Sequence, residues 1–154
     1  MYQTIFLASG LLIASLFNHT HAQEPTNLNV KKQALIRYFE KGEYRSDLQL
    51  TVNKAKKYLA LRVMDNNKKA VKQKLAIVLD IDETTLTLYP CMKKHSFGGT
   101  LPQVVSWVNT YTLAPIKPMH EFYQFAKANK VSVFFVSGRK PSTKLATIKN
   151  LKKS

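Results

Sequence analysis

The chain has 154 residues, a length that suits one domain and is too short for a second full one. Hydrophobic residues make up 45% of it, which is enough to form one core. Its formal net charge of +15 comes from 24 Lys and Arg residues against 9 Asp and Glu residues, and it favours anionic partners such as phosphate esters. The basic residues form no aromatic-interleaved stripe, which argues against a nucleic-acid-binding module. The single cysteine, Cys91, excludes an internal disulfide.

Residues 1–22 form an apolar leader without Lys, Arg, Asp or Glu. A hydrophobic segment from Ile5 to Phe17 is followed by a small-residue cleavage site that ends at Ala22. We expect a secretory signal that is cleaved after Ala22, an exported protein that is periplasmic or secreted, and no membrane association after cleavage. An uncleaved N-terminal anchor stays open as the alternative, because the start of the leader lacks the usual basic residue.

Two helical patterns follow the leader. The first begins near Val30 and ends at Gly42, and the second begins at Ser46 or Asp47, either of which can cap a helix. The second pattern breaks at Asp65 and is followed by a Lys-rich connection. Its apolar residues fall on one helical face: Leu48, Val52, Ala55, Leu59 and Val63.

Two apolar runs read as strands. The first is 75–79, and the second, 131–136, is predicted to be a buried strand. A helix from Met119 to about Asn129 separates them, so we expect a parallel pair joined by a crossover. The fold class is therefore α/β, with a partial parallel sheet, flanking helices and a preceding helical segment, in one domain over 23–154.

Two further segments lie outside this pair of strands. Residues 89–117 are punctuated by Pro and Gly and contain a short helical pattern from Val104 to Val108, which is typical of an insertion. A last helix is expected after Pro141, which suits a first helical position. Its predicted core-facing residues are Leu145, Ile148 and Leu151.

Polar side chains follow both predicted strands. Asp80, Asp82 and Thr84 come directly after the first, and Ser137-Gly138-Arg139 follows the second. An acidic pair in a turn often only solvates a loop or caps a helix. Because ligands of open parallel sheets bind beyond the carboxyl ends of the strands, the two segments together instead favour a site for a phosphoryl group and a hard cation.

These residues resemble a known family. Residues 75–86 resemble motif I of the haloacid dehalogenase (HAD) superfamily, and 131–137 resemble its motif II. The chain more narrowly resembles the secreted acid phosphatases of subfamily IIIB, the bacterial class B/C-type enzymes and their relatives among plant vegetative storage proteins. Further matching positions are Gly42-Glu43-Tyr44, Asp47, Ala55, Tyr58-Leu59, Trp107, Thr147 and Asn150-Leu151.

The resemblance implies an HAD-like Rossmannoid fold, with 89–117 as a cap-type insertion, and a role for each acidic residue. Asp80 is the implied nucleophile, which forms an aspartyl-phosphate, and Asp82 is the implied general acid and base. Mg²⁺ is the implied cofactor, held by the Asp80 carboxylate and the Asp82 backbone carbonyl.

The resemblance also implies a phosphate-binding set made of Thr84, Ser137, Gly138 and Arg139. The two hydroxyls are expected to donate hydrogen bonds to phosphate oxygens. For Arg139, a phosphate contact and an exposed structural role both stay open. The implied substrate is a small-molecule phosphate monoester, and no oligomeric state is predicted.

The family has a third motif with a Lys and a fourth with an acidic residue, and neither is identified here. The last acidic residue is Glu121, before the second strand. We therefore expect a chain truncated after the second motif. The leading prediction is an acid phosphatase that is inactive if nothing replaces those groups. The alternative is a non-catalytic relic, or a binding or storage protein of phosphatase shape.

Overall fold

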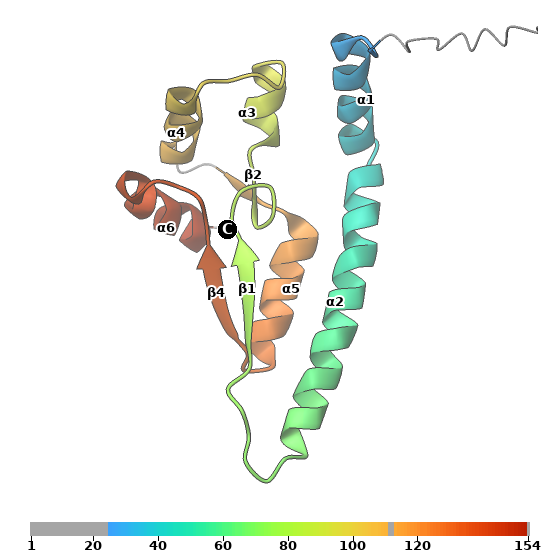
Figure 1. Ribbon diagram of the computed structural model, residues 1–154, viewed down its shortest axis with the longest axis vertical. Helices are drawn as coiled ribbons and strands as arrows, with labels where there is room; N and C mark the ends of the chain where they lie inside the picture. The colour runs from blue at the N-terminus through green and yellow to red at the C-terminus, as the bar shows by residue number, and fades with distance from the viewer. Residues whose placement is uncertain (1–24, 111–112, 154) are drawn as a thin grey trace, which may run out of the picture.

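The structure is a computed structural model that describes residues 25–110 and 113–153 (Figure 1). The predicted signal at 1–22 lies outside the described residues and stays a prediction. None of the helices in the described part is long and apolar enough to span a membrane. The elements in chain order are α1 Leu28–Glu40, α2 Glu43–Asn67, β1 Ala76–Asp80, β2 Leu86–Thr87, α3 Tyr89–Lys94, α4 Leu101–Asn109, β3 Ala114–Pro115, α5 Lys117–Ala128, β4 Ser132–Val136, the 3-10 turn η1 Pro141–Thr143, and α6 Lys144–Lys153.

The two N-terminal helices are confirmed, but the second begins earlier than predicted. Helix α2 starts at Glu43, because Gly42 adopts a φ of +86° that lets the chain turn directly from α1 into α2. Asp47 does not cap the helix, as its carboxylate accepts a hydrogen bond from the Tyr38 hydroxyl at 2.7 Å.

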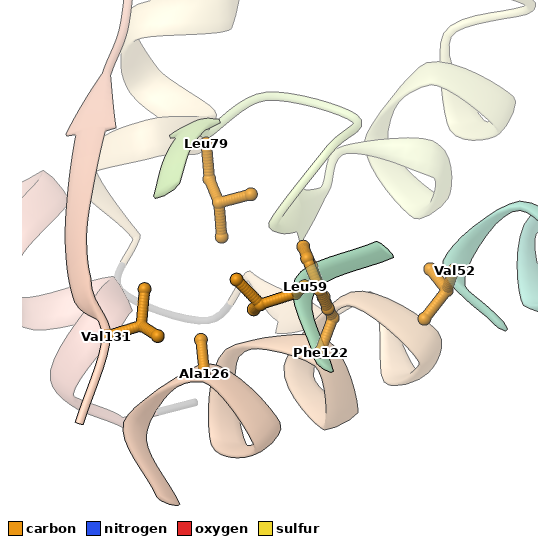
Figure 2. Packing of buried hydrophobic residues seen from close by; sticks show 6 residues of the cluster. All are labelled: Val52, Leu59, Leu79, Phe122, Ala126 and Val131. Atoms are coloured by element: carbon orange, nitrogen blue, oxygen red, sulfur yellow. The ribbon is translucent and has the colours of Figure 1, made fainter. Parts of the chain in front are cut away.

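The main core lies between α2, α5 and one face of the strands. In Figure 1, α2 and α5 run side by side next to the strands, and Figure 2 shows the side chains that meet there. The predicted apolar face of α2 is confirmed, since Val52 and Leu59 are buried and the other three residues pack against them. The remaining buried members of this cluster are Leu79, Phe122, Ala126 and Val131.

The predicted parallel pair is confirmed. Strand β1 pairs with β4 in a register that runs from Ala76 opposite Ser132 to Asp80 opposite Val136. Both arrows point the same way in Figure 1, toward α3 and α4. The carboxyl ends of the two strands therefore meet at one edge of the sheet.

The prediction that the second strand is buried is wrong. Val133 and Phe135 face the core, whereas the Phe134 side chain between them is 59% exposed. Val78 of β1 is its partner in the register and is exposed on the same face. Helices α2 and α5 cover one face of the pair, so alternate apolar residues on the other face meet solvent.

The segment predicted as an insertion contains two short helices. Helix α4 includes the expected Val104–Val108 pattern and begins with a capping box between Thr100 and Gln103. Helix α3 was not predicted, because its six residues are too few to show a helical period. A short antiparallel ladder of β2 and β3 closes the segment by pairing Leu86 with Pro115.

The last helix is confirmed, but its predicted core face is wrong. Leu145 is 75% exposed and Ile148 is also exposed, whereas Leu151 is partly buried. The buried residues of α6 are small or polar: Ala146, Thr147 and Asn150. Asn150 bridges two segments, as its side chain accepts from the Leu113 N–H at 3.2 Å and donates to the Val108 carbonyl at 2.8 Å.

An ion pair and stacked rings connect α1 to α3. Glu40 accepts a hydrogen bond from the Lys93 ammonium and a longer one, at 3.4 Å, from the Tyr89 hydroxyl. The rings of Phe39 and Tyr89 stack beside this pair. The hydrogen bond from Lys93 lowers the pKa of the Glu40 carboxyl.

The core packing gives a first prediction. Leu59→Ala should lower the free energy of unfolding by about 3 kcal/mol, because it leaves a cavity between α2 and α5. Leu61→Ala, on the exposed face of the same helix, is the matched control and should change stability by no more than about 0.5 kcal/mol. Urea unfolding followed by circular dichroism measures both, and equal losses would contradict the packing described.

The ion pair gives a second prediction. Lys93→Met should raise the pKa of the Glu40 carboxyl toward its ordinary value, whereas Lys94→Met should not. Because the folded-state pKa is lowered, the pair contributes stability above the ordinary carboxyl pKa and loses it as pH falls through the folded-state pKa. NMR titration of the Glu40 side chain checks this, and an unchanged pKa in Lys93→Met would exclude the pairing.

Candidate functional site

The sheet register brings the two predicted motifs to one place. Asp80 is the last residue of β1 and lies opposite Val136, the last residue of β4. Asp82 and Thr84 follow the first strand, and Ser137 follows the second. The chain therefore leaves both strands at the same sheet edge with polar side chains, as the sequence predicted.

A tight loop holds the first motif. The Thr85 hydroxyl donates to the Asp80 carbonyl at 2.6 Å, and the N–H groups of Thr85 and Leu86 both donate to the Ile81 carbonyl at 2.9 Å. Glu83 has a φ of +53°, a conformation that costs about 1–3 kcal/mol for a residue with a side chain. Backbone hydrogen bonds thus fix the turn that follows Asp80.

Glu83 does not join the other acidic residues. Its carboxylate accepts hydrogen bonds from the Leu88 N–H and, at 3.2 Å, from the Thr87 hydroxyl. It thereby caps the turn that leads into α3. The other two acids of this segment, Asp80 at the end of β1 and Asp82 in the loop, have different surroundings.

The Asp80 carboxylate has little to neutralise it. Thr84 donates to it from 3.5 Å, a long contact. The ion pairs found among the described residues do not include Asp80. No group of three or more His, Cys, Asp or Glu residues in this part of the chain is arranged to hold a metal ion. A carboxylate outside these ion pairs nevertheless fits Mg²⁺, which commonly binds through one or two carboxylates and keeps several waters.

Asp82 is held by Arg139. The Arg139 Nε lies 3.2 and 3.0 Å from the two Asp82 carboxylate oxygens, and Nη2 lies 2.6 Å from Oδ1. The Arg139 side chain is 8% exposed, and that of Asp82 is 34% exposed. The exposure considered for a structural Arg139 is therefore wrong, because this side chain is buried. It connects the two motifs, as a structural role requires.

Helix α6 fixes the Arg139 guanidinium from behind. Arg139 Nη1 donates to the Thr147 hydroxyl at 2.9 Å, and that hydroxyl donates to the Thr143 carbonyl at 2.9 Å. The sequence reasoning did not assign these supporting roles to Thr147, or to Thr85 in the first loop. The sequence feature that could have revealed these two roles is a threonine near each motif, at a position that is buried in the fold.

Ser137 and Gly138 complete the second motif. The Ser137 hydroxyl accepts a hydrogen bond from the Arg139 N–H at 3.1 Å, which leaves its own proton for another acceptor. A Cβ added at Gly138 would meet nothing within 4 Å, so the backbone there is open to a ligand.

The Arg139 contacts give a third prediction. Arg139→Met should lower the free energy of unfolding by about 1–3 kcal/mol, because it leaves the Asp82 carboxylate without its charged donor. Lys140→Met removes the neighbouring, exposed cation and should have little effect. Thermal unfolding of both variants tests the assignment, which fails if the two are equally stable.

Comparisons with known proteins agree with these observations. The sequence model of a family described as "HAD superfamily, subfamily IIIB (Acid phosphatase)" matches residues 7–154. A search of the curated proteins found no match.

Solved structures show the same fold. The class C acid phosphatase from Bacillus anthracis with tungstate bound is 25% identical, with a TM-score of 0.69 over 82% of this chain and 52% of that one. A second structure of the Bacillus anthracis class C enzyme is 26% identical, with a TM-score of 0.62 over 82% and 53%. This chain thus spans about half the length of these enzymes.

The match covers nearly the whole chain and includes both loops at the sheet edge. The resemblance expected from the two motifs is confirmed: the chain belongs to the acid phosphatase family of HAD subfamily IIIB.

Proposed function

We propose that the chain hydrolyses small-molecule phosphate monoesters through an aspartyl-phosphate. Asp80 attacks phosphorus, the bond to the alcohol oxygen breaks, and Asp82 gives its proton to that oxygen. Water then attacks the aspartyl-phosphate, Asp82 takes a proton from the water, and inorganic phosphate is released. The observation that carries this proposal is the register that brings Asp80 and Ser137 to one sheet edge.

The Arg139 contacts pair with the ionised form of Asp82, which is the form that takes a proton from water in the second step. In the first step this proposal requires a protonated Asp82, which weakens the ion pair. Asp82 Oδ1 accepts two hydrogen bonds from Arg139, whereas Oδ2 accepts one. A carboxylate oxygen can accept two, so Oδ2 keeps a position for water or a leaving oxygen. Arg139 orients Asp82 in this proposal, and any direct contact with phosphate is secondary.

Phosphate oxygens are bound in this proposal by Thr84, Ser137 and the open backbone at Gly138. Hydroxyl and N–H donors aimed at the charge that develops on these oxygens typically contribute about 3 kcal/mol each to the barrier reduction. The Ser137 hydroxyl is suited to this task because its acceptor site is already used by the Arg139 N–H.

HAD phosphatases generally use a divalent metal, and we propose Mg²⁺ for this chain. The Asp80 carboxylate and the Asp82 backbone carbonyl would hold it. When bound, Mg²⁺ neutralises charge between the nucleophile and phosphate. The ion pairs found among the described residues do not include Asp80, so its carboxylate is available to such a cation in this proposal.

We further propose that residues 89–117 form the cap over this site and that the domain spans 23–154. Helices α3 and α4 lie beyond the carboxyl ends of both strands in Figure 1, which supports this role. Acid phosphatases of this kind are often secreted or periplasmic, and export is the proposed fate of this chain as well.

A second candidate is a protein that binds phosphate esters without turning them over. The observation that favours it is the lack, within the described residues, of three or more metal-binding side chains in one group. With fewer carboxylates the site binds Mg²⁺ more weakly, and the charge on phosphate is less well neutralised.

Hydrolysis of p-nitrophenyl phosphate in Mg²⁺ by the purified chain provides the fourth prediction. Asp82→Asn should lower kcat about 10²- to 10⁴-fold, and Asp80→Asn should abolish turnover. Asp65→Asn, at the far end of α2, is the control and should leave the rate unchanged. Chelation should remove activity that added Mg²⁺ restores.

The same assay separates the two candidates. Turnover that persists in Asp80→Asn would reject the assigned nucleophile. A folded wild-type chain that binds inorganic phosphate without hydrolysing the ester would establish the second candidate.

A further inference from the structure

A pocket of about 370 Å³ lies beside Asp82, between α4 and the segment that follows β4. Its wall is largely aliphatic and comes from one face of α4: Leu101, Val104, Val105 and Val108. The opposite wall is formed by Gly138, Arg139, Lys140 and Thr143.

The pocket is built on fixed parts of the fold. Val108 and Thr143 are buried in its two walls. Asn150 of α6 donates to the Val108 carbonyl at 2.8 Å, and the Thr143 hydroxyl donates to the Lys140 carbonyl at 2.9 Å. Each wall is thus held by its own hydrogen bond, the α4 wall to α6 and the other wall within the turn from Lys140 to Thr143.

Its position relative to the two acids is informative. Asp82 lines the pocket, whereas Asp80 does not. In an in-line displacement the leaving oxygen lies opposite the nucleophile, and the acid that protonates it lies on the same side as the leaving group. The organic part of the ester therefore extends toward the side that Asp82 faces.

We propose that this pocket binds the organic group of the substrate, and that the group is apolar. This inference rests on the proposed phosphatase function and deepens it, because it names the substrate class as phosphate monoesters of aliphatic or aromatic alcohols. Val105, whose side chain is half-buried in the middle of the α4 wall, is the residue that determines the room available to that group.

The charges around the pocket support an apolar occupant. Asp82 and Arg139 neutralise each other across a bidentate ion pair. The Thr143 hydroxyl is already bonded to a backbone carbonyl, and Lys140 is exposed. A polyhydroxylated group such as a sugar would lose its water here and find few free partners, which is costly.

A series of n-alkyl phosphates tests the proposal on the full chain, with kcat/KM measured by phosphate release. From ethyl to butyl to hexyl phosphate, kcat/KM should rise about two- to fourfold per methylene. Glycerol phosphate, which is similar in size to butyl phosphate, should be the poorer substrate. A flat series with normal turnover would overturn the pocket inference and leave the phosphatase function intact.

Two substitutions on α4 locate the effect. Val105→Trp fills the pocket and should remove the chain-length dependence while ethyl phosphate is still hydrolysed. Ser106→Trp adds the same bulk at an exposed position outside the pocket and should retain the dependence. If Val105→Trp is unfolded by circular dichroism, Val105→Ser takes its place and should flatten the series by making the wall polar.

Alkylphosphonates are not hydrolysed, so their binding tests the pocket without depending on catalysis. Calorimetry in the presence of Mg²⁺ measures this binding. Hexylphosphonate should bind more tightly than methylphosphonate to the wild-type chain and to Ser106→Trp, but not to Val105→Trp. This result without ester hydrolysis would reject the proposed reaction and retain the pocket. Equal affinities for the two phosphonates would overturn the pocket whatever the turnover.

Discussion

The parallel pairing of β1 with β4 is the constraint on which the rest of the site depends. Its register places Asp80 opposite Val136, so the loops that follow the two strands leave the sheet side by side. A shift of one residue would turn Asp80 to the other face and expose Leu79, which is buried against α2 and α5. The hydrophobic core therefore fixes the position of the acidic residue.

The loops beyond the strands are held by polar contacts, and each threonine supports a different acidic residue. Thr85 holds the backbone of the first loop at Asp80, and Thr147 holds Arg139, which in turn holds Asp82. The Asp82 carboxylate is thus held in one orientation, whereas Asp80 takes part in none of the ion pairs found among the described residues. In the proposed reaction, this arrangement supplies an oriented acid and a nucleophile whose charge a bound cation would neutralise.

Local patterns in the sequence predicted the strands, the main helices and the meeting of the two motifs, because each depends on short-range periodicity and on the directions of parallel strands. Whether a given apolar residue is buried depends on which helix packs against its face, and a local sequence pattern does not predict that packing. Phe134 and Leu145 were both expected in the core and are exposed, since the helices of the described part cover only one face of the sheet and α6 packs through Thr147 and Asn150. The Arg139–Asp82 pair joins residues 57 positions apart. Local periodicity carries no information on such a contact, which is visible only in the folded structure.

Charge acts on this chain at two distances. The net charge of +15 attracts anions over a Debye length of about 8 Å at physiological salt, and it acts on every anion alike. Within the site, the Arg139 guanidinium is paired with the Asp82 carboxylate. This general attraction raises the local concentration of all anions, so in the proposed function selectivity between phosphate esters has to come from contacts with their uncharged part. The aliphatic wall of α4, which faces the ion-paired side of the site, provides a surface on which such discrimination can depend.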